Sequence, residues 1–205
     1  MKDSERGRER LEKVVFLDRD GTINEEVHYL HKPEDLHFLD GVSQAVRMLR
    51  QAGFKLVVIT NQAGVARGYY TCKDVERLHE YMNEQLKKEG AWIDAFYYCP
   101  HHPVYGVGKY KQVCHCRKPD IGMFEMAEKR FFVEKSHSYM IGDKWIDIEA
   151  GLRYGVKGIL VGTGYGFSLK KEMEEKGERP IYDFYAKTLV DAANYIITRE
   201  NESGM

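Results

Sequence analysis

The chain has 205 residues, of which 43% are hydrophobic, and this is enough for one domain with a full core. Its 31 Lys and Arg residues are balanced by 32 Asp and Glu residues, and the net charge of -1 excludes the broad positive field that holds a nucleic acid. No apolar stretch approaches the roughly 20 residues that cross a bilayer, and the charged N-terminus lacks the apolar segment of a secretory signal. We therefore expect a cytoplasmic monomer without membrane or nucleic-acid partners, for which a small phosphorylated ligand remains allowed.

Five short apolar runs predict the strands of a parallel sheet. They are rich in β-branched and aromatic residues, as expected for strands that are buried on both faces. The runs cover residues 14–17, 55–59, 95–98, 138–141 and 158–161.

Amphipathic patterns between these runs predict the helices. One pattern starts at Val42 and is closed by Gly53, and Thr71 is placed to cap the next helix. The inward residues of that capped helix span 75–86, and the other helical patterns cover residues 121–131, 146–154 and 189–196. The alternation of strand and helix predicts an α/β fold with a doubly wound, mainly parallel, Rossmann-like sheet.

The predicted elements form a single domain over residues 14–200 without a large cap domain. We expect a flexible tail over 1–13 and a frayed end over 201–205. Residues 99–118 lack periodicity, although this stretch is long for a connection in an α/β domain. A loop of this length needs something that holds it.

Four residues at the two ends of this loop have the pattern of a metal site. Cys99 and His101 open the loop and Cys114 and Cys116 close it, which gives three thiolates and one imidazole for a tetrahedral Zn²⁺. In a reducing compartment, clustered cysteines are more often metal ligands than disulfides. The alternative is a loop with scattered reduced cysteines. Cys72 sits apart from this cluster, and we interpret it as a structural residue. A zinc ion with four protein ligands would be structural rather than catalytic.

Polar side chains able to do chemistry stand at the ends of three predicted strands. Asp18 and Asp20 follow the first strand, Thr60 and Asn61 the second, and Asp143 the fourth. Because ligands collect at the carboxyl ends of such strands, we expect these side chains to meet. Each pair alone is typical of a solvated turn, but the coincidence at three strand ends argues against that interpretation.

These residue types suit phosphoryl transfer. Asp18, Asp20 and Asp143 offer the hard oxygen ligands that Mg²⁺ prefers, and the cation would neutralise charge beside a phosphate. Asp18 would attack phosphorus to form an aspartyl-phosphate. Asp20 would protonate the leaving alcohol and then deprotonate the hydrolytic water. Thr60 would bind phosphoryl oxygens, and Lys118 would offset the charge of the transition state.

The order of these motifs resembles the haloacid dehalogenase-like superfamily of phosphatases. Residues 16–22 are similar to its first motif, 58–61 to its second and 141–147 to its fourth, and Lys118 stands where the third-motif cation is expected. Within this superfamily the chain most resembles the D-glycero-D-manno-heptose 1,7-bisphosphate 7-phosphatases. That resemblance is carried by residues 18–24, 60–68, 98–103 and 114–119.

The resemblance implies a role for each site residue. Asp18 would be the nucleophile, Asp20 the general acid and base, and both would join Asp143 at the magnesium site, Asp20 through its backbone carbonyl. The family pattern favours His101 over the neighbouring His102 as the zinc ligand. The implied substrate contacts are Glu26, Val27, His28, Tyr29, Thr60, Asn61, Gln62, Ala63, Arg117, Lys118 and Lys144.

The implied activity is the removal of the C7 phosphate of heptose 1,7-bisphosphate, in the biosynthesis of heptose nucleotide precursors such as those of lipopolysaccharide. A histidinol-phosphate phosphatase is the nearest rival, although residues 27–29 and 66–68 look more like the heptose enzymes. A phosphatase of nucleic-acid ends conflicts with the near-neutral charge. A catalytically silent, zinc-bearing scaffold conflicts with the intact set of catalytic carboxylates and lysine.

Overall fold

The core of the molecule is one parallel sheet, in a computed structural model that describes residues 11–203. The strands lie in the order β3-β2-β1-β4-β5-β6, and each neighbouring pair is parallel. They are β1 (Val14–Leu17), β2 (Lys55–Asn61), β3 (Ala95–Cys99), β4 (Tyr139–Gly142), β5 (Lys157–Val161) and β6 (Phe184–Ala186). The predicted fold class is confirmed.

Helices connect the strands. They are α1 (Val42–Gln51), α2 (Ala63–Ala66), α3 (Cys72–Lys88), α4 (Gly122–Glu128), α5 (Trp145–Tyr154), α6 (Gly166–Glu175) and α7 (Leu189–Ser203), with the short 3-10 turns η1 (Pro33–Asp35), η2 (Gly108–Tyr110) and η3 (Lys135–His137). Thr71 caps α3 as predicted, since its hydroxyl accepts a hydrogen bond from Asp74 N and the Asp74 carboxylate accepts one in return. Within the described range, no helix combines the length and the apolar character that a membrane span requires.

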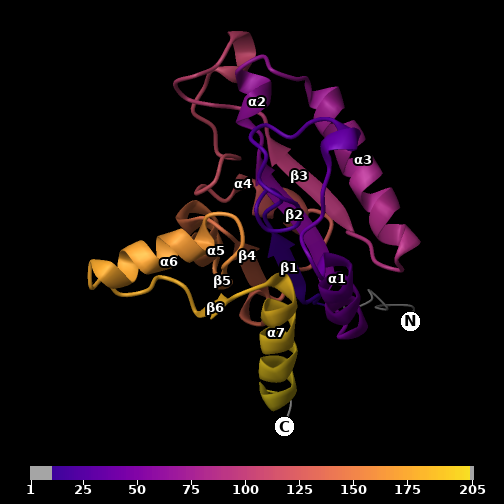
Figure 1. Cartoon of the computed structure of the whole chain (residues 1–205), viewed down its shortest axis with the longest axis vertical. Helices are drawn as coiled ribbons and strands as arrows, with labels where there is room; N and C mark the ends of the chain where they lie inside the picture. The colour runs from indigo at the N-terminus through magenta and orange to yellow at the C-terminus, as the bar shows by residue number, and fades with distance from the viewer. Residues whose placement is uncertain (1–10, 204–205) are drawn as a thin grey trace, which may run out of the picture.

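Helices cover both faces of the sheet. Along β1, Val15 and Leu17 pack into a core cluster that includes residues of α1, α3 and α7, whereas Val14 and Phe16 pack against α4 and α5. Figure 1 shows α1 beside α7 at one end of the molecule, and these two helices are in contact. Because successive side chains of a strand point to opposite faces, the uninterrupted apolar run of β1 serves two cores at once.

The strand order places the ends of β1, β2 and β4 next to one another. From β1 the chain moves outward through β2 to β3, and it then returns to the other side of β1 with β4 (Figure 1). The order therefore reverses at β1, which is the place where ligands bind in sheets of this type.

Some predicted boundaries differ from the structure. The elements α2, α6 and β6 have no counterpart in the prediction, and α6 buries only Gly166 and Met173, so its amphipathic signal is weak. The frayed end predicted over 201–205 is wrong for 201–203, which continue α7, and 204–205 lie outside the described residues. The predicted tail falls mostly on residues 1–10, also outside that range, while Glu12 pairs with Val133.

Candidate active site

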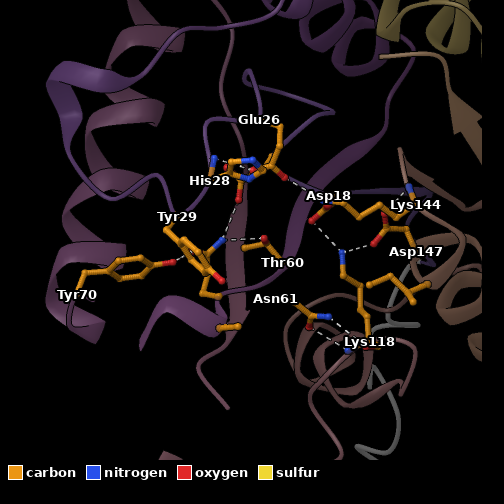
Figure 2. Close-up of a pocket in the computed structure, with 14 residues that line it drawn as sticks. Asp18, Glu26, His28, Tyr29, Thr60, Asn61, Tyr70, Lys118, Lys144 and Asp147 are labelled. Carbon is orange, nitrogen blue, oxygen red and sulfur yellow. Dashed lines mark hydrogen bonds and ion pairs between the residues drawn. The ribbon is translucent and has the colours of Figure 1, made fainter. Parts of the chain in front are cut away.

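The centre of the site is a buried lysine between two aspartates. Lys118 Nζ lies 2.9 Å from Asp18 Oδ1 and 2.7 Å from Asp147 Oδ1, and all three side chains are almost completely buried. Figure 2 shows the ammonium group between the two carboxylates. Asp18 directly follows β1 and Asp147 lies in the first turn of α5, so the ion pairs join the end of β1 to the fourth motif.

Residues at the end of β2 hold Lys118 in place. Its ammonium group donates to Ile59 O at 2.8 Å. The Asn61 side chain accepts a hydrogen bond from Lys118 N at 3.0 Å and donates one to Lys118 O at 3.1 Å. Asn61 was predicted to contact substrate, and here it fixes the backbone that carries the lysine.

Three carboxylates gather at this point. Asp18, Asp143 and Asp147 each offer an oxygen, and these oxygens lie within 4.8 Å of one another. Asp143 is fully buried, and its Oδ1 has no hydrogen-bond partner among residues 11–203. Gly21 (φ +83°) and Gly164 (φ +52°) pack so closely on Asp143 that a Cβ on either would overlap its carboxylate. Glycine is needed at both positions for this contact and for the positive φ.

The charges of this cluster are strongly coupled. Burial and the nearby Asp18 carboxylate raise the pKa of Asp143 to about 7, and the same two causes raise the pKa of Asp147 to about 6. Burial also acts to raise the pKa of Asp18, but the charges of Lys118 and Lys144 outweigh it and leave this pKa below its ordinary value. Asp18 is therefore the carboxylate that is held ionised, as a nucleophile must be.

Asp20 lies apart from this carboxylate group. Its Oδ1 accepts hydrogen bonds from Arg19 Nε and Asn24 Nδ2, and its Oδ2 accepts from Arg19 Nη2 and Gln62 Nε2. The side chain still lines the same pocket as Asp18. Two neighbouring carboxylates thus occupy different environments, one beside a lysine and one beside an arginine.

A polar pocket opens in front of Asp18. It is lined by the predicted catalytic residues and by every predicted substrate contact except Val27 and Arg117. Thr60 accepts a hydrogen bond from Gln62 Nε2 at 3.0 Å. Lys144 Nζ lies 3.1 Å from Glu26 Oε2, and this ion pair joins the 26–29 loop to the residue that precedes α5 (Figure 2).

The two predicted contacts outside the pocket have other surroundings. Val27 is 42% exposed, and Arg117 donates a hydrogen bond to His101 O at 3.1 Å. The pocket also includes Tyr70 and Ile146, which the sequence interpretation did not select. Tyr70 OH donates to Gln62 Oε1 at 2.8 Å.

The structure brings the four predicted zinc ligands together at the base of the 99–118 loop. The three sulfur atoms lie 3.2–3.4 Å apart, and His101 Nδ1 lies 3.4 Å from Cys116 Sγ. The ligand atoms are all within 4.8 Å of one another, and none of the thiols is in a disulfide. Zn–S bonds of about 2.3 Å would separate sulfurs by about 3.8 Å, so this donor set fits a tetrahedral metal after a small expansion.

His102 has a different role from His101. Its Nδ1 accepts hydrogen bonds from Val104 N at 3.1 Å and Tyr105 N at 2.9 Å. This imidazole therefore stabilises the local turn of residues 102–105, while His101 Nδ1 lies near the sulfurs.

Comparison with known proteins places this geometry in a family. The chain is 42% identical over 186 residues to the D-glycero-beta-D-manno-heptose-1,7-bisphosphate 7-phosphatase of Haemophilus ducreyi, covering 90% of this chain and 98% of the relative. The chain belongs to the heptose-1,7-bisphosphate 7-phosphatase family. A second member, from Photorhabdus laumondii, is 43% identical over 154 residues, which cover 75% of this chain and 84% of the relative, and its name specifies the alpha anomer.

Family models and solved structures agree with this assignment. A model described as HAD-hydrolase-like matches residues 115–192, and one described as polynucleotide kinase 3 phosphatase matches residues 13–148. The D,D-heptose 1,7-bisphosphate phosphatase of B. bronchiseptica, solved with magnesium and phosphate, has a TM-score of 0.77 and 30% identity, and the alignment covers 91% of this chain and 99% of that chain. The chain is thus a phosphatase of the haloacid dehalogenase superfamily, and the resemblance seen in its motifs is confirmed.

Proposed function

We propose that this chain is the magnesium-dependent phosphatase that removes the C7 phosphate of D-glycero-D-manno-heptose 1,7-bisphosphate. The observation that carries the chemistry is the buried Lys118 between Asp18 and Asp147, at the wall of a polar pocket. The substrate follows from membership of the heptose-1,7-bisphosphate 7-phosphatase family. Heptose nucleotide precursor biosynthesis is the corresponding place in metabolism.

The first step transfers the phosphoryl group to the protein. An Asp18 oxygen forms a bond to phosphorus while the bond from phosphorus to the C7 oxygen breaks. The leaving oxygen takes the electron pair of that bond and receives a proton from Asp20. Lys118 and Thr60 stabilise the charge on the phosphoryl oxygens as it develops.

The second step releases phosphate. Asp20, now ionised, takes a proton from water as the water oxygen bonds to phosphorus. The bond between phosphorus and Asp18 breaks and returns its electron pair to the carboxylate. The products are the heptose 1-phosphate and inorganic phosphate, and both aspartates are restored.

The donor set of the site fits a hard divalent cation. Asp18 and Asp143 would hold Mg²⁺ with the Asp20 carbonyl, and the Oδ1 of Asp143, which accepts no hydrogen bond from residues 11–203, is suited to this role. Bound magnesium would supply charge neutralisation and orientation of the phosphoryl group. Asp147, absent from the predicted set, belongs to the same group of carboxylates and instead pairs with Lys118.

Cys99, His101, Cys114 and Cys116 would hold a structural Zn²⁺. The ion would join the two ends of the 99–118 loop and fix the backbone that leads from Cys116 into Lys118. Arg117, between them, would reach a second charged group of the substrate. Glu26, His28 and Tyr29, which line the pocket, would contact the sugar.

A phosphate-release screen tests the substrate. It compares both heptose bisphosphate anomers, because the names of relatives specify different ones, with fructose 1,6-bisphosphate, histidinol phosphate and a 3′-phosphorylated oligonucleotide. The oligonucleotide is included because one matching family model is described as polynucleotide kinase 3 phosphatase. Asp18→Asn protein, purified in parallel, gives the background from contaminating phosphatases.

We expect kcat/KM for at least one heptose anomer to exceed that for every other compound by about 100-fold or more. A preference for histidinol phosphate or for the oligonucleotide would refute the substrate and leave the chemistry intact. Release of phosphate at the same rate by the Asp18→Asn protein would refute the chemistry.

A further inference from the structure

Arg19 is a buried cation next to the nucleophile that the chemistry above does not use. Its side chain is fully buried and is among the largest in the protein with no exposed surface. A guanidinium without solvent is costly unless its donors are paired, so its partners indicate why it is there.

Two of its nitrogens, Nε and Nη2, donate to the same carboxylate. Arg19 Nε donates to Asp20 Oδ1 at 3.1 Å, and Arg19 Nη2 donates to Asp20 Oδ2 at 2.8 Å. Both oxygens of Asp20 are thus held by one rigid planar group, the arrangement that makes arginine a stronger orienting residue than lysine.

The rest of the guanidinium is anchored to other parts of the fold. Nη2 also reaches Leu30 O at 3.1 Å and Gln62 Oε1 at 3.3 Å, and Nη1 lies 3.4 Å from His79 Nε2. Since arginine can only donate, His79 Nε2 is the acceptor, and burial holds the pKa of His79 well below its usual range. The cation is therefore fixed from the loop after β1, the end of β2 and α3.

Asp20 is immobilised from its other side by groups of the same network. Asn24 Nδ2 donates to Asp20 Oδ1 at 2.9 Å, and Gln62 Nε2 donates to Oδ2 at 3.2 Å. The Arg19 carbonyl accepts from the amides of residues 22–24, which shapes the turn that carries Asp20. Gln62 also donates to Thr60 Oγ1, so the acid-base carboxylate and the phosphate-binding hydroxyl share one support.

We propose that Arg19 is the positioning residue that holds the Asp20 carboxylate in the geometry for both of its proton transfers. The proposal rests on the acid-base role of Asp20 in the proposed function. A positioning role and a purely structural role of Arg19 predict different kinetics, because a misplaced Asp20 slows only the steps that move a proton.

Leaving-group dependence distinguishes these roles. The heptose alkoxide needs a proton as it leaves, whereas 4-nitrophenolate leaves without one. Loss of Asp20 function therefore impairs both steps with the sugar bisphosphate, but only hydrolysis of the aspartyl-phosphate with 4-nitrophenyl phosphate. The experiment measures the pre-steady-state release of 4-nitrophenolate and steady-state turnover of both compounds for the wild-type protein, Arg19→Met and Asp20→Asn.

For Arg19→Met we expect kcat for the heptose bisphosphate to fall about 100-fold, with KM changed less than threefold. The first turnover of 4-nitrophenyl phosphate should keep its rate within about threefold and precede a slower steady state, giving a burst of about one nitrophenolate per chain. Arg153→Met, which removes an exposed arginine paired with Asp120 and Glu149, is the matched control and should behave as the wild type.

Arg19→Lys keeps the charge but not the two-pronged contact, and it provides a second test if the Met variant does not fold. It should show the same burst with a fall of about tenfold in turnover. In a protein that already carries Asp20→Asn, Arg19→Lys should lower turnover by less than a further twofold, because both changes act on the same step.

Equal slowing of the burst and of sugar turnover by the Arg19 variants, alongside a selective effect of Asp20→Asn, would overturn the positioning role alone. An unchanged turnover in Arg19→Lys and Arg19→Met would do the same. A non-selective effect of Asp20→Asn would instead refute the acid-base assignment in the proposed function.

Discussion

Lys118 Nζ lies 2.9 Å from Asp18 Oδ1, although 100 residues separate the two positions along the chain. The contact depends on two independent supports. Asp18 directly follows the carboxyl end of β1, a central strand of the sheet. Lys118 directly follows the 99–116 stretch, whose ends carry the predicted zinc ligands. Because the pair is buried beside a second carboxylate, it links the stability of the fold to its chemistry.

Replacing this lysine should harm both. Lys118→Met leaves Asp18 and Asp147 buried without their cation, and loss of one partner of a buried pair costs about 3 kcal/mol. We expect urea unfolding to show this decrease in the free energy of unfolding, and we expect kcat to be at least 100-fold lower. Lys135→Met is the control, since this lysine forms an exposed pair with Glu128 worth less than about 1 kcal/mol. A Lys118→Met protein with wild-type turnover would contradict the role of the lysine.

Replacing Asp143 should raise the stability of the metal-free protein while it removes metal binding, whereas replacing Lys118 lowers both stability and activity. Its buried carboxylate faces the charge of Asp18, and its Oδ1 accepts no hydrogen bond in the described part of the chain, with Lys144 Nζ 3.9 Å away. Asp143→Asn removes this repulsion, so the metal-free variant should be more stable than the metal-free wild type by about 1 kcal/mol. Added Mg²⁺ should raise the melting temperature of the wild type and leave that of the variant unchanged.

Thermal unfolding with and without Mg²⁺ decides this prediction. If Mg²⁺ stabilises the variant as strongly as the wild type, Asp143 is not a ligand of the metal.

The two adjacent histidines should differ in their effect on zinc. His101→Ala removes a ligand atom from the sulfur cluster, while His102→Ala removes only the contacts with Val104 N and Tyr105 N. We expect elemental analysis to find about one zinc per chain in the wild type and in His102→Ala, and much less in His101→Ala. Zinc lost only from His102→Ala would reverse the ligand assignment.

Buried His79 should make stability fall in acid. Burial and the Arg19 charge hold the pKa of His79 well below its ordinary value in the folded protein. The unfolded chain binds a proton on this residue below about pH 6.5, so unfolding takes up a proton there and the folded state loses stability as the pH falls. The contribution of His79 should decrease between pH 7 and pH 5, by at most about 2 kcal/mol, the limit reached when folded His79 binds no proton at pH 5.

The matched variant is His79→Gln, whose amide oxygen can still accept from Arg19. Urea unfolding of both proteins across this pH range isolates the histidine, because other groups contribute equally to the two curves. Parallel curves would show that the pKa of His79 is the same in the folded and unfolded states, which would contradict its lowered value in the folded protein.

Local pattern was sufficient for much of the fold. Both ends of β1 were predicted because all four of its residues are buried and a charged residue follows. β2 runs two residues beyond its predicted end, since Thr60 and Asn61 keep a strand backbone while their side chains serve the site. β6 has only three residues, and a run so short and half-buried gives no recognisable pattern.

The site was less accessible to sequence reasoning where a residue has two roles. Asp147 lies in the first turn of α5, where an acidic residue is explained by capping, and it does accept a hydrogen bond from Lys144 N. Its ion pair with Lys118 depends on the fold. The spacing of Asp18 and Asp20 likewise did not reveal that Arg19 donates to both oxygens of the second carboxylate.

Chemical trapping of the phosphorylated protein tests the central claim most directly. Protein quenched during turnover is reduced with borohydride, which converts an aspartyl-phosphate to homoserine, and the modified residue is located by peptide mass spectrometry. We expect homoserine at position 18 and at no other aspartate, with none formed when substrate is omitted. Modification at Asp20, Asp143 or Asp147 instead, or turnover without any trapped species, would contradict Asp18 as the nucleophile.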